Sequence, residues 1–229
     1  MSFVHLSHIL DPKDGAFPGE PTLEVRQDSV VSETGKPFNS TISTLPNHVG
    51  THMDGPHHFN TTGLDFHELP IEFFAYEGDE VLVVDLPHRG KPREVILKED
   101  IEPYTEQLKG KRLLLLRTGF VKIKFTDPHT YEHEGVSIHP EFSKYLNEEF
   151  PELACIGVDF LSLGSPTNDY GPEAHRWLLG NYTGHIICAI EDINLEPLGD
   201  KKIKAITLGP LRVKGVDSSQ VNVMAWLED

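Results

Sequence analysis

The segment 47–59 (Asn-His-Val-Gly-Thr-His-Met-Asp-Gly-Pro-His-His-Phe) restricts the conformations open to this part of the chain. Gly50, Gly55 and Pro56 disfavour a long helix, because glycine is costly and proline disruptive inside one. In an extended backbone, side chains alternate with a period of two, so residues at even spacing face the same side. Four potential metal ligands stand at even spacing here: His48, His52, Asp54 and His58. The sequence therefore predicts that these four side chains converge.

Three imidazoles and one carboxylate suit a borderline divalent cation such as zinc or manganese. His48 and His52 are four residues apart, but no glutamate follows His48 as in the helical zinc motif of metalloproteases. The alternative is a histidine-rich surface loop without a ligand. Asp54, His58 and the rigid glycines and proline favour the metal site.

Charge and length restrict the possible partners. The chain has 229 residues and a formal net charge of −16. This charge argues against nucleic acid and anionic membrane surfaces as partners. No apolar stretch approaches the length of a membrane span, and the N-terminus lacks the pattern of a signal peptide. We therefore expect a cytoplasmic protein.

Cys155 and Cys188 lie in apolar runs and are expected to be buried in strands, with neither a disulfide nor a catalytic role.

The hydrophobic pattern predicts one mixed α/β domain over residues 1–229, with more strands than helices. Strands are expected at 3–9, 22–31, 38–46, 81–86, 113–116, 153–160, 185–190, 203–208, 211–214 and 221–226. Helical segments are expected at 69–74, 98–108, 140–150 and 173–179, the last ended by Gly180. Residues 122–137 and 162–172 are expected to be loops, with His129 and His133 in solvent.

The pattern from His48 to His58 resembles the His-x-Gly-Thr-His-x-Asp-x-Pro-x-His signature of the metal-dependent cyclase-like hydrolases. This family contains bacterial kynurenine formamidase (arylformamidase) and isatin hydrolase. Shorter resemblances run along the chain. They are Leu-Ser-His near the start, Phe-Pro-Gly at 17–19, Leu-Arg-Thr-Gly at 116–119, Ile-Gly-Val-Asp at 156–159, His-Arg-Trp-Leu-Leu at 175–179 and Ile-Glu-Asp-Ile-Asn-Leu at 190–195.

The resemblance implies a swivelling β/β/α-type fold, a homodimer or larger oligomer, and two divalent ions per chain, zinc or alternatively manganese. His48, His52 and Asp54 would bind the first ion, with Asp54 bridging to the second. His175 and Glu191 would complete the pair of sites, although spacing alone would select neither of them. His58 would be the catalytic acid and base, and its neighbour His57 a pocket or surface residue.

Two departures from the formamidases bear on the substrate. The formamidases carry tryptophan, facing substrate, where this chain has Phe17, which we expect to contact substrate here. The interval from His175 to Glu191 is also longer, by the segment 181–184 (Asn-Tyr-Thr-Gly). Both changes are expected where substrate specificity is set.

The implied activity is hydrolysis of a C–N bond in a small aryl amide such as N-formylkynurenine. A cyclic amide like isatin, or a lactone, would use the same site and stays open. A non-catalytic metal-binding or ligand-binding protein would retain the fold without a need for His58. A serine hydrolase is disfavoured because the chain has no Gly-x-Ser-x-Gly motif, and a cysteine hydrolase because both cysteines lie in apolar runs.

Overall fold

The main sheet is mixed and organises the fold of this computed structural model, which describes residues 2–31 and 35–228. Its strands are β1 (Ser2–His5), β4 (His52–Asp54), β5 (Ala75–Glu77), β6 (Val81–Asp85), β8 (Leu113–Arg117), β10 (Cys155–Val158), β11 (Cys188–Glu191), β12 (Ile203–Pro210) and β13 (Ser218–Leu227). They lie in the order β5-β12-β13-β4-β11-β10-β8-β6, and β1 pairs with β13. Strands β6, β8, β10 and β11 are parallel, whereas β4 is antiparallel to both of its neighbours.

The parallel strands are buried on both faces, which explains their continuous apolar sequence. In β8, Leu114 and Leu116 join the core cluster on the side of the helices, while Leu113 and Leu115 join the cluster on the opposite side. Strand alternation assigns Cys155 and Cys188 to that second cluster, and both thiols are free and buried. The predicted burial of the two cysteines in strands is therefore confirmed.

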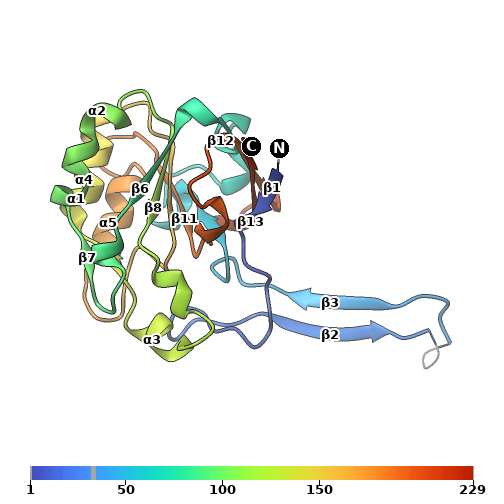
Figure 1. Ribbon diagram of the computed structural model, residues 1–229. Helices are drawn as coiled ribbons and strands as arrows, with labels where there is room; N and C mark the ends of the chain where they lie inside the picture. Colours follow the sequence, from blue (N-terminus) through green and yellow to red (C-terminus); the bar gives the residue numbers. More distant parts are fainter. Residues whose placement is uncertain (1, 32–34, 229) are drawn as a thin grey trace.

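Helices cover one face of the parallel strands (Figure 1). They are α1 (Lys98–Ile101), α2 (Thr105–Leu108), α3 (Pro128–His133), α4 (Pro140–Glu149) and α5 (Gly171–Leu178). Helix α4 starts with proline at its first position, where the missing N–H is not needed. Helix α5 packs against α4 and is followed by Gly180, whose φ of +83° reverses the chain. This turn leads the chain back into β11.

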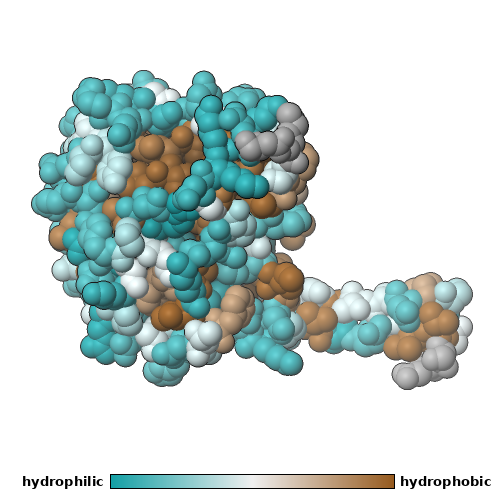
Figure 2. Space-filling model, viewed as in Figure 1, coloured by the Kyte–Doolittle hydropathy of each residue, from teal (hydrophilic) through white to brown (hydrophobic). Residues whose placement is uncertain are grey.

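Strands β2 (Glu24–Ser29) and β3 (Ser40–Thr44) form a separate antiparallel pair. Figure 1 shows this pair projecting away from the body of the molecule. Several apolar side chains of this hairpin are exposed, including Phe38 and Val25, and they form hydrophobic surface along it in Figure 2. A third, short pair joins β7 (Val95–Ile96) to β9 (Ser137–Ile138).

The predicted mixed α/β fold is confirmed, and most predicted strands and helices are found with shifted ends. The predicted helix 98–108 is split into α1, a 3₁₀ turn at Glu102–Tyr104 and α2. Pro103 accounts for the split, because it cannot donate a hydrogen bond inside a helix. The span of a single domain over 1–229 stays a prediction.

Two predicted segments were wrong. Residues 211–214 are not a strand, and the alternating Leu211 and Val213 are exposed. Residues 122–137 are not a plain surface loop, because they contain α3 and bury Lys124 and Tyr131. His129 and His133 are exposed, as expected. In the described part of the chain, no helix is long and apolar enough to cross a membrane.

Candidate metal centre

Strand β4 lies between β11 and β13 and carries two of the predicted ligands. His52 and Asp54 are two residues apart in this strand and therefore face the same side of the sheet. His52 is opposite Glu191, the last residue of β11, and Asp54 is opposite the small Ala189. Because Ala189 belongs to the core cluster on the helix side, this register directs all three polar side chains toward α5.

His175 reaches the same point from α5. Its Nε2 lies 3.4 Å from Asp54 Oδ2 and 3.3 Å from Glu191 Oε1. His52 Nε2 lies 3.5 Å from Asp54 Oδ1 and 3.3 Å from Glu191 Oε2. All four side chains are almost completely buried. Two imidazoles and two carboxylates thus face one another. His175 and Glu191, which only the family resemblance predicts as ligands, are part of this group.

Backbone carbonyls fix the orientation of both buried imidazoles. His52 Nδ1 donates to the carbonyl of Gly50 at 2.8 Å, and His175 Nδ1 donates to the carbonyl of Gly171 at 2.6 Å. Each ring therefore turns Nε2 toward the carboxylates. Metal-binding histidines are commonly held in this way by a hydrogen bond at the other nitrogen. Gly50 has a φ of +66°, and a Cβ there would meet Leu10, so the glycine is needed for this turn.

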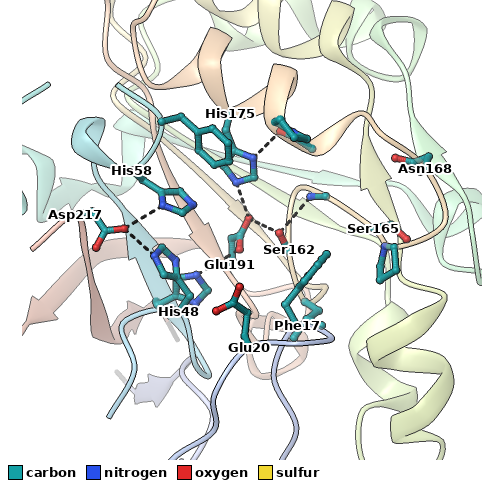
Figure 3. Close-up of a pocket in the computed structure, with 17 residues that line it drawn as sticks. Phe17, Glu20, His48, His58, Ser162, Ser165, Asn168, His175, Glu191 and Asp217 are labelled. Atoms are coloured by element: carbon teal, nitrogen blue, oxygen red, sulfur yellow. Dashed lines mark hydrogen bonds and ion pairs between the residues drawn. The ribbon is translucent and has the colours of Figure 1, made fainter. Parts of the chain in front are cut away.

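His48 and His58 come from the two turns that flank β4, so the segment is extended only over His52–Asp54. His48 Nδ1 lies 3.1 Å from Asp54 Oδ1. On the other side of the ring, His48 Nε2 lies 2.8 Å from Asp217 Oδ2. His58 Nδ1 donates to the same Asp217 oxygen at 3.0 Å, and the two rings are 4.2 Å apart at their centroids (Figure 3). The expected convergence occurs, but through turns rather than one continuous strand.

The carboxylates hold positive charge at this cluster. Burial lowers the pKa of His48, but the neighbouring carboxylates of Asp217 and Asp54 outweigh burial and raise it to about 10. Burial also lowers the pKa of His175, which Asp54 and Glu191 raise to about 10. Burial and Asp54 raise the pKa of Glu191, but His175 and His52 bring it down to about 2. The raised pKa values favour protonated imidazoles beside these carboxylates, and a divalent cation would displace those protons.

The donor set fits such a cation. Both carboxylate oxygens of Asp54 and Nε2 of His52 are buried and have no hydrogen-bond partner. Ligand atoms around a tetrahedral ion at about 2.0–2.1 Å would stand about 3.3 Å apart. The nitrogen–oxygen distances in the cluster are 3.1 to 3.5 Å. Two groups of side chains each bring three ligand atoms within 4.8 Å of one another: His48, Asp54 and His58, and His52, Asp54 and Glu191.

A cavity of about 600 Å³ opens beside this cluster. Phe17, Phe59, Leu161 and Pro166 supply apolar lining, and Ser165 and Asn168 add polar groups. Phe59 stacks on His175 with ring centroids 4.6 Å apart. The cavity can accommodate a small aromatic molecule next to the histidines and carboxylates.

Comparison with known proteins identifies the family of this chain. Residues 4–165 match a family model described as putative cyclase. The chain belongs to the cyclase family. It is 28% identical to a kynurenine formamidase of Bacillus cereus over 97% of this chain and 96% of that protein. An uncharacterized protein of Haemophilus influenzae is 41% identical over 54% of this chain and 84% of its own length. Isatin hydrolase A of Labrenzia aggregata, solved bound to benzyl benzoate, has the same fold, with a TM-score of 0.81, 21% identity and coverage of 98% and 93%.

Asp217 is the main functional candidate of this cyclase-family chain that the sequence analysis missed. It lies immediately before β13, which pairs with β4, and this pairing brings it to His48 and His58. Hydrogen bonds from these two imidazoles hold the pKa of Asp217 well below its usual range. No local signal marks Asp217, because it is an ordinary acid beside a glycine-containing turn.

Glu191 has further partners that were also missed. Its Oε1 accepts hydrogen bonds from Ser162 Oγ at 3.0 Å and from the N–H of Leu163 at 2.6 Å. Both donors belong to the loop that follows β10. This loop was predicted as a loop, but its contact with Glu191 depends on the parallel pairing of β10 with β11.

The two departures from the formamidases have different positions. Phe17 lines the cavity, whereas none of residues 181–184 is among the described residues lining it. Asn181 instead donates to the carbonyl of Phe59, a lining residue, at 2.7 Å. His57 is a surface residue 3.3 Å from Asp65.

Proposed function

We propose that this protein is a metal-dependent amidohydrolase that cleaves the C–N bond of a small aryl amide, most like N-formylkynurenine. The observation that carries the proposal is the arrangement of His52 and His175. Each turns Nε2 toward both Asp54 and Glu191 at the wall of an aromatic-lined cavity. The similarity to kynurenine formamidase over almost the whole chain supports the choice of substrate class.

In this proposal the cluster binds two divalent ions, zinc or alternatively manganese. His48, His52 and Asp54 would hold the first ion. Asp54 would also contribute to the second, together with His175 and Glu191. Ions bound here would polarise the amide carbonyl and lower the pKa of a water molecule toward neutrality. The buried, unpartnered oxygens of Asp54 support this role.

His58 is the proposed acid and base. Because Nδ1 donates to Asp217, Nε2 is the nitrogen left for proton transfer. His58 takes a proton from the attacking water, whose oxygen bonds to the carbonyl carbon. It then gives the proton to the nitrogen as the C–N bond breaks. His58 lines the cavity together with Phe17, the proposed substrate contact.

The same site could open a cyclic amide or a lactone. Isatin hydrolase A has the same fold as this chain. A non-catalytic protein that only binds metal is the alternative from another class. It would bind metal at Asp54 and turn over none of these compounds.

The test is hydrolysis of N-formylkynurenine, isatin and an aryl lactone by protein loaded with zinc or with manganese. We expect turnover of N-formylkynurenine that disappears in Asp54→Ala. Turnover of isatin or the lactone alone would replace the substrate class and retain the site. Metal-loaded protein that hydrolyses none of the three would contradict the proposed activity.

We also propose a homodimer or larger homo-oligomer and a cytoplasmic location. The hairpin β2–β3 supports the oligomer, because an isolated two-stranded hairpin is at best marginally stable in water. Its exposed Val25, Phe38 and Ile42 would be covered by another subunit. Sedimentation velocity tests this proposal, and a monomer at micromolar concentration would contradict it.

A further inference from the structure

A rigid turn carries an acidic side chain into the cavity. Residues 17–20 (Phe-Pro-Gly-Glu) form a β-turn in which the N–H of Glu20 donates to the carbonyl of Phe17 at 2.9 Å. Pro18 and Gly19 occupy its centre, and Gly19 has a φ of +94°. Proline followed by a left-handed glycine is the sequence of a type II turn. The turn therefore fixes the separation of Phe17 and Glu20.

Both ends of this turn line the cavity. Figure 3 shows the carboxylate of Glu20 directed toward His48 and Glu191, with Phe17 beside it. Glu20 is exposed and lines the cavity, so its carboxylate is accessible to a substrate that enters it. In the described ranges 2–31 and 35–228, no hydrogen bond or ion pair involves this carboxylate.

The charge of the cavity lining is uneven. Its acids are Glu20, Glu191 and Asp217, and among the described residues no lysine or arginine lines it. Glu191 contacts His52 and His175, and Asp217 contacts His48 and His58, so these two acids are already paired. Glu20 is the lining acid left to interact with a ligand.

We infer that Glu20 makes this cavity favour aryl amides that carry a positive charge on the part remote from the amide over those whose only charge there is a carboxylate. The inference rests on the proposed amidohydrolase function. An opposite charge near a carboxylate is attracted, and a like charge is repelled. Proteins that favour carboxylate ligands usually supply arginine or lysine, which this lining lacks.

The effect should be moderate because Glu20 is exposed. We expect the ratio of kcat/KM for a cationic over an anionic substrate to fall threefold to tenfold in Glu20→Gln, about 0.7 to 1.4 kcal/mol. The difference should shrink when the salt concentration rises, because salt weakens interactions between exposed charges. The Debye length for this screening is about 10 Å at 0.1 M.

Three formanilides provide the test: 4-(aminomethyl)formanilide, formanilide and 4-formamidobenzoate. They carry the same scissile bond and differ in the charge at the remote end. Metal-loaded wild type, Glu20→Gln and Glu24→Gln are compared. Glu24 is an exposed acid outside the cavity lining, so Glu24→Gln removes the same charge without altering the site. We expect Glu24→Gln to retain the wild-type ratio.

The metal content of Glu20→Gln is measured in parallel and should equal that of wild type. Loss of metal would make Glu20 a ligand and overturn the inference. An unchanged ratio, or an equal loss for all three formanilides, would also overturn it. A wild-type preference for 4-formamidobenzoate would also overturn it, because the positive charge of the metal would then determine the selectivity.

A binding measurement separates this inference from the proposed function. If metal-loaded protein hydrolyses neither the formanilides nor N-formylkynurenine, isatin and the aryl lactone, the proposed function fails. Calorimetry with acetophenones carrying the same three para substituents, which cannot be hydrolysed, then decides the inference. The aminomethyl compound should bind more tightly than the carboxylate, and Glu20→Gln should reduce that difference. Equal dissociation constants in the two proteins would contradict it.

Discussion

The carboxylate of Asp217 accepts a hydrogen bond from Nδ1 of His58 at 3.0 Å, although the two residues are 159 positions apart in the chain. The same oxygen lies 2.8 Å from Nε2 of His48. One acid therefore orients both a proposed metal ligand and the proposed acid and base. The pairing of β13 with β4 creates this contact.

Asp217→Asn should lower kcat about tenfold to a hundredfold, the usual effect of removing a partner that orients a metal ligand. The substitution keeps the size of the side chain and removes its charge. Metal content and kcat are measured together, with Asp65→Asn as the control, because Asp65 contacts the surface residue His57. Asp65→Asn should resemble wild type. Wild-type kcat in Asp217→Asn would remove Asp217 from the mechanism.

His58→Ala should lower kcat by about two to four orders of magnitude, the typical contribution of general acid–base catalysis. The variant should still bind metal, because the proposed ligands are other residues. Elemental analysis of the purified variant is the check. Loss of metal would instead assign His58 to the ligand group that it can form with His48 and Asp54.

The sequence could predict His48, His52, Asp54 and His58 because they share one short segment, although only His52 and Asp54 converge through strand alternation. His175 and Glu191 could be named only from the family resemblance, since a histidine on a short helix and an acid at a strand end are common. Asp217 and Ser162 could not be predicted as site residues, because their contacts arise from the pairing of strands that are far apart in the sequence.

Local patterns also misled in two places. Leu211 and Val213 alternate with charged residues as in a strand, yet both are exposed in a connection between β12 and β13. The segment 122–137 is polar in sequence but contains the buried Tyr131, whose hydroxyl donates to the buried carboxylate of Asp192 at 2.7 Å. Such burial depends on a distant partner, which local hydropathy does not report.

Lys124→Met should destabilise the protein by about 3–5 kcal/mol, because it leaves a buried carboxylate without its cation. Lys124 Nζ lies 2.6 Å from Asp192 Oδ2, and the two side chains are 7% and 1% exposed. Lys122→Met is the control, since its ion pair with Glu196 is exposed and should contribute less than about 1 kcal/mol. Urea denaturation measures both. Equal changes in the free energy of unfolding would show that burial of the Lys124–Asp192 pair does not matter for stability.

Asp100→Asn should reduce stability in a pH-dependent way. Burial raises the pKa of Asp100, but hydrogen bonds from the N–H of Leu97, from His88 and from Arg89 outweigh it and lower the pKa below its usual value. A carboxyl with a lowered folded pKa stabilises the fold above its unfolded pKa of about 3.9 and loses that effect as pH falls through the folded value.

We therefore expect wild type to exceed Asp100→Asn by about 1–2 kcal/mol in free energy of unfolding at pH 7. The difference should close as the pH falls below about 4. Glu99→Gln, at an exposed neighbouring position, should change the stability by less than about 0.5 kcal/mol. A difference between wild type and Asp100→Asn that is constant from pH 3 to pH 7 would contradict the account.

Metal stoichiometry tests whether this cluster binds two divalent ions. Wild type and Asp54→Ala are stripped with chelator, reloaded with zinc or manganese, dialysed and analysed for metal per chain. Asp54 is the carboxylate that lies against His48, His52 and His175, so the account predicts two ions per wild-type chain and loss of metal from the variant. Asp54→Ala that keeps the full metal content would contradict the proposed site.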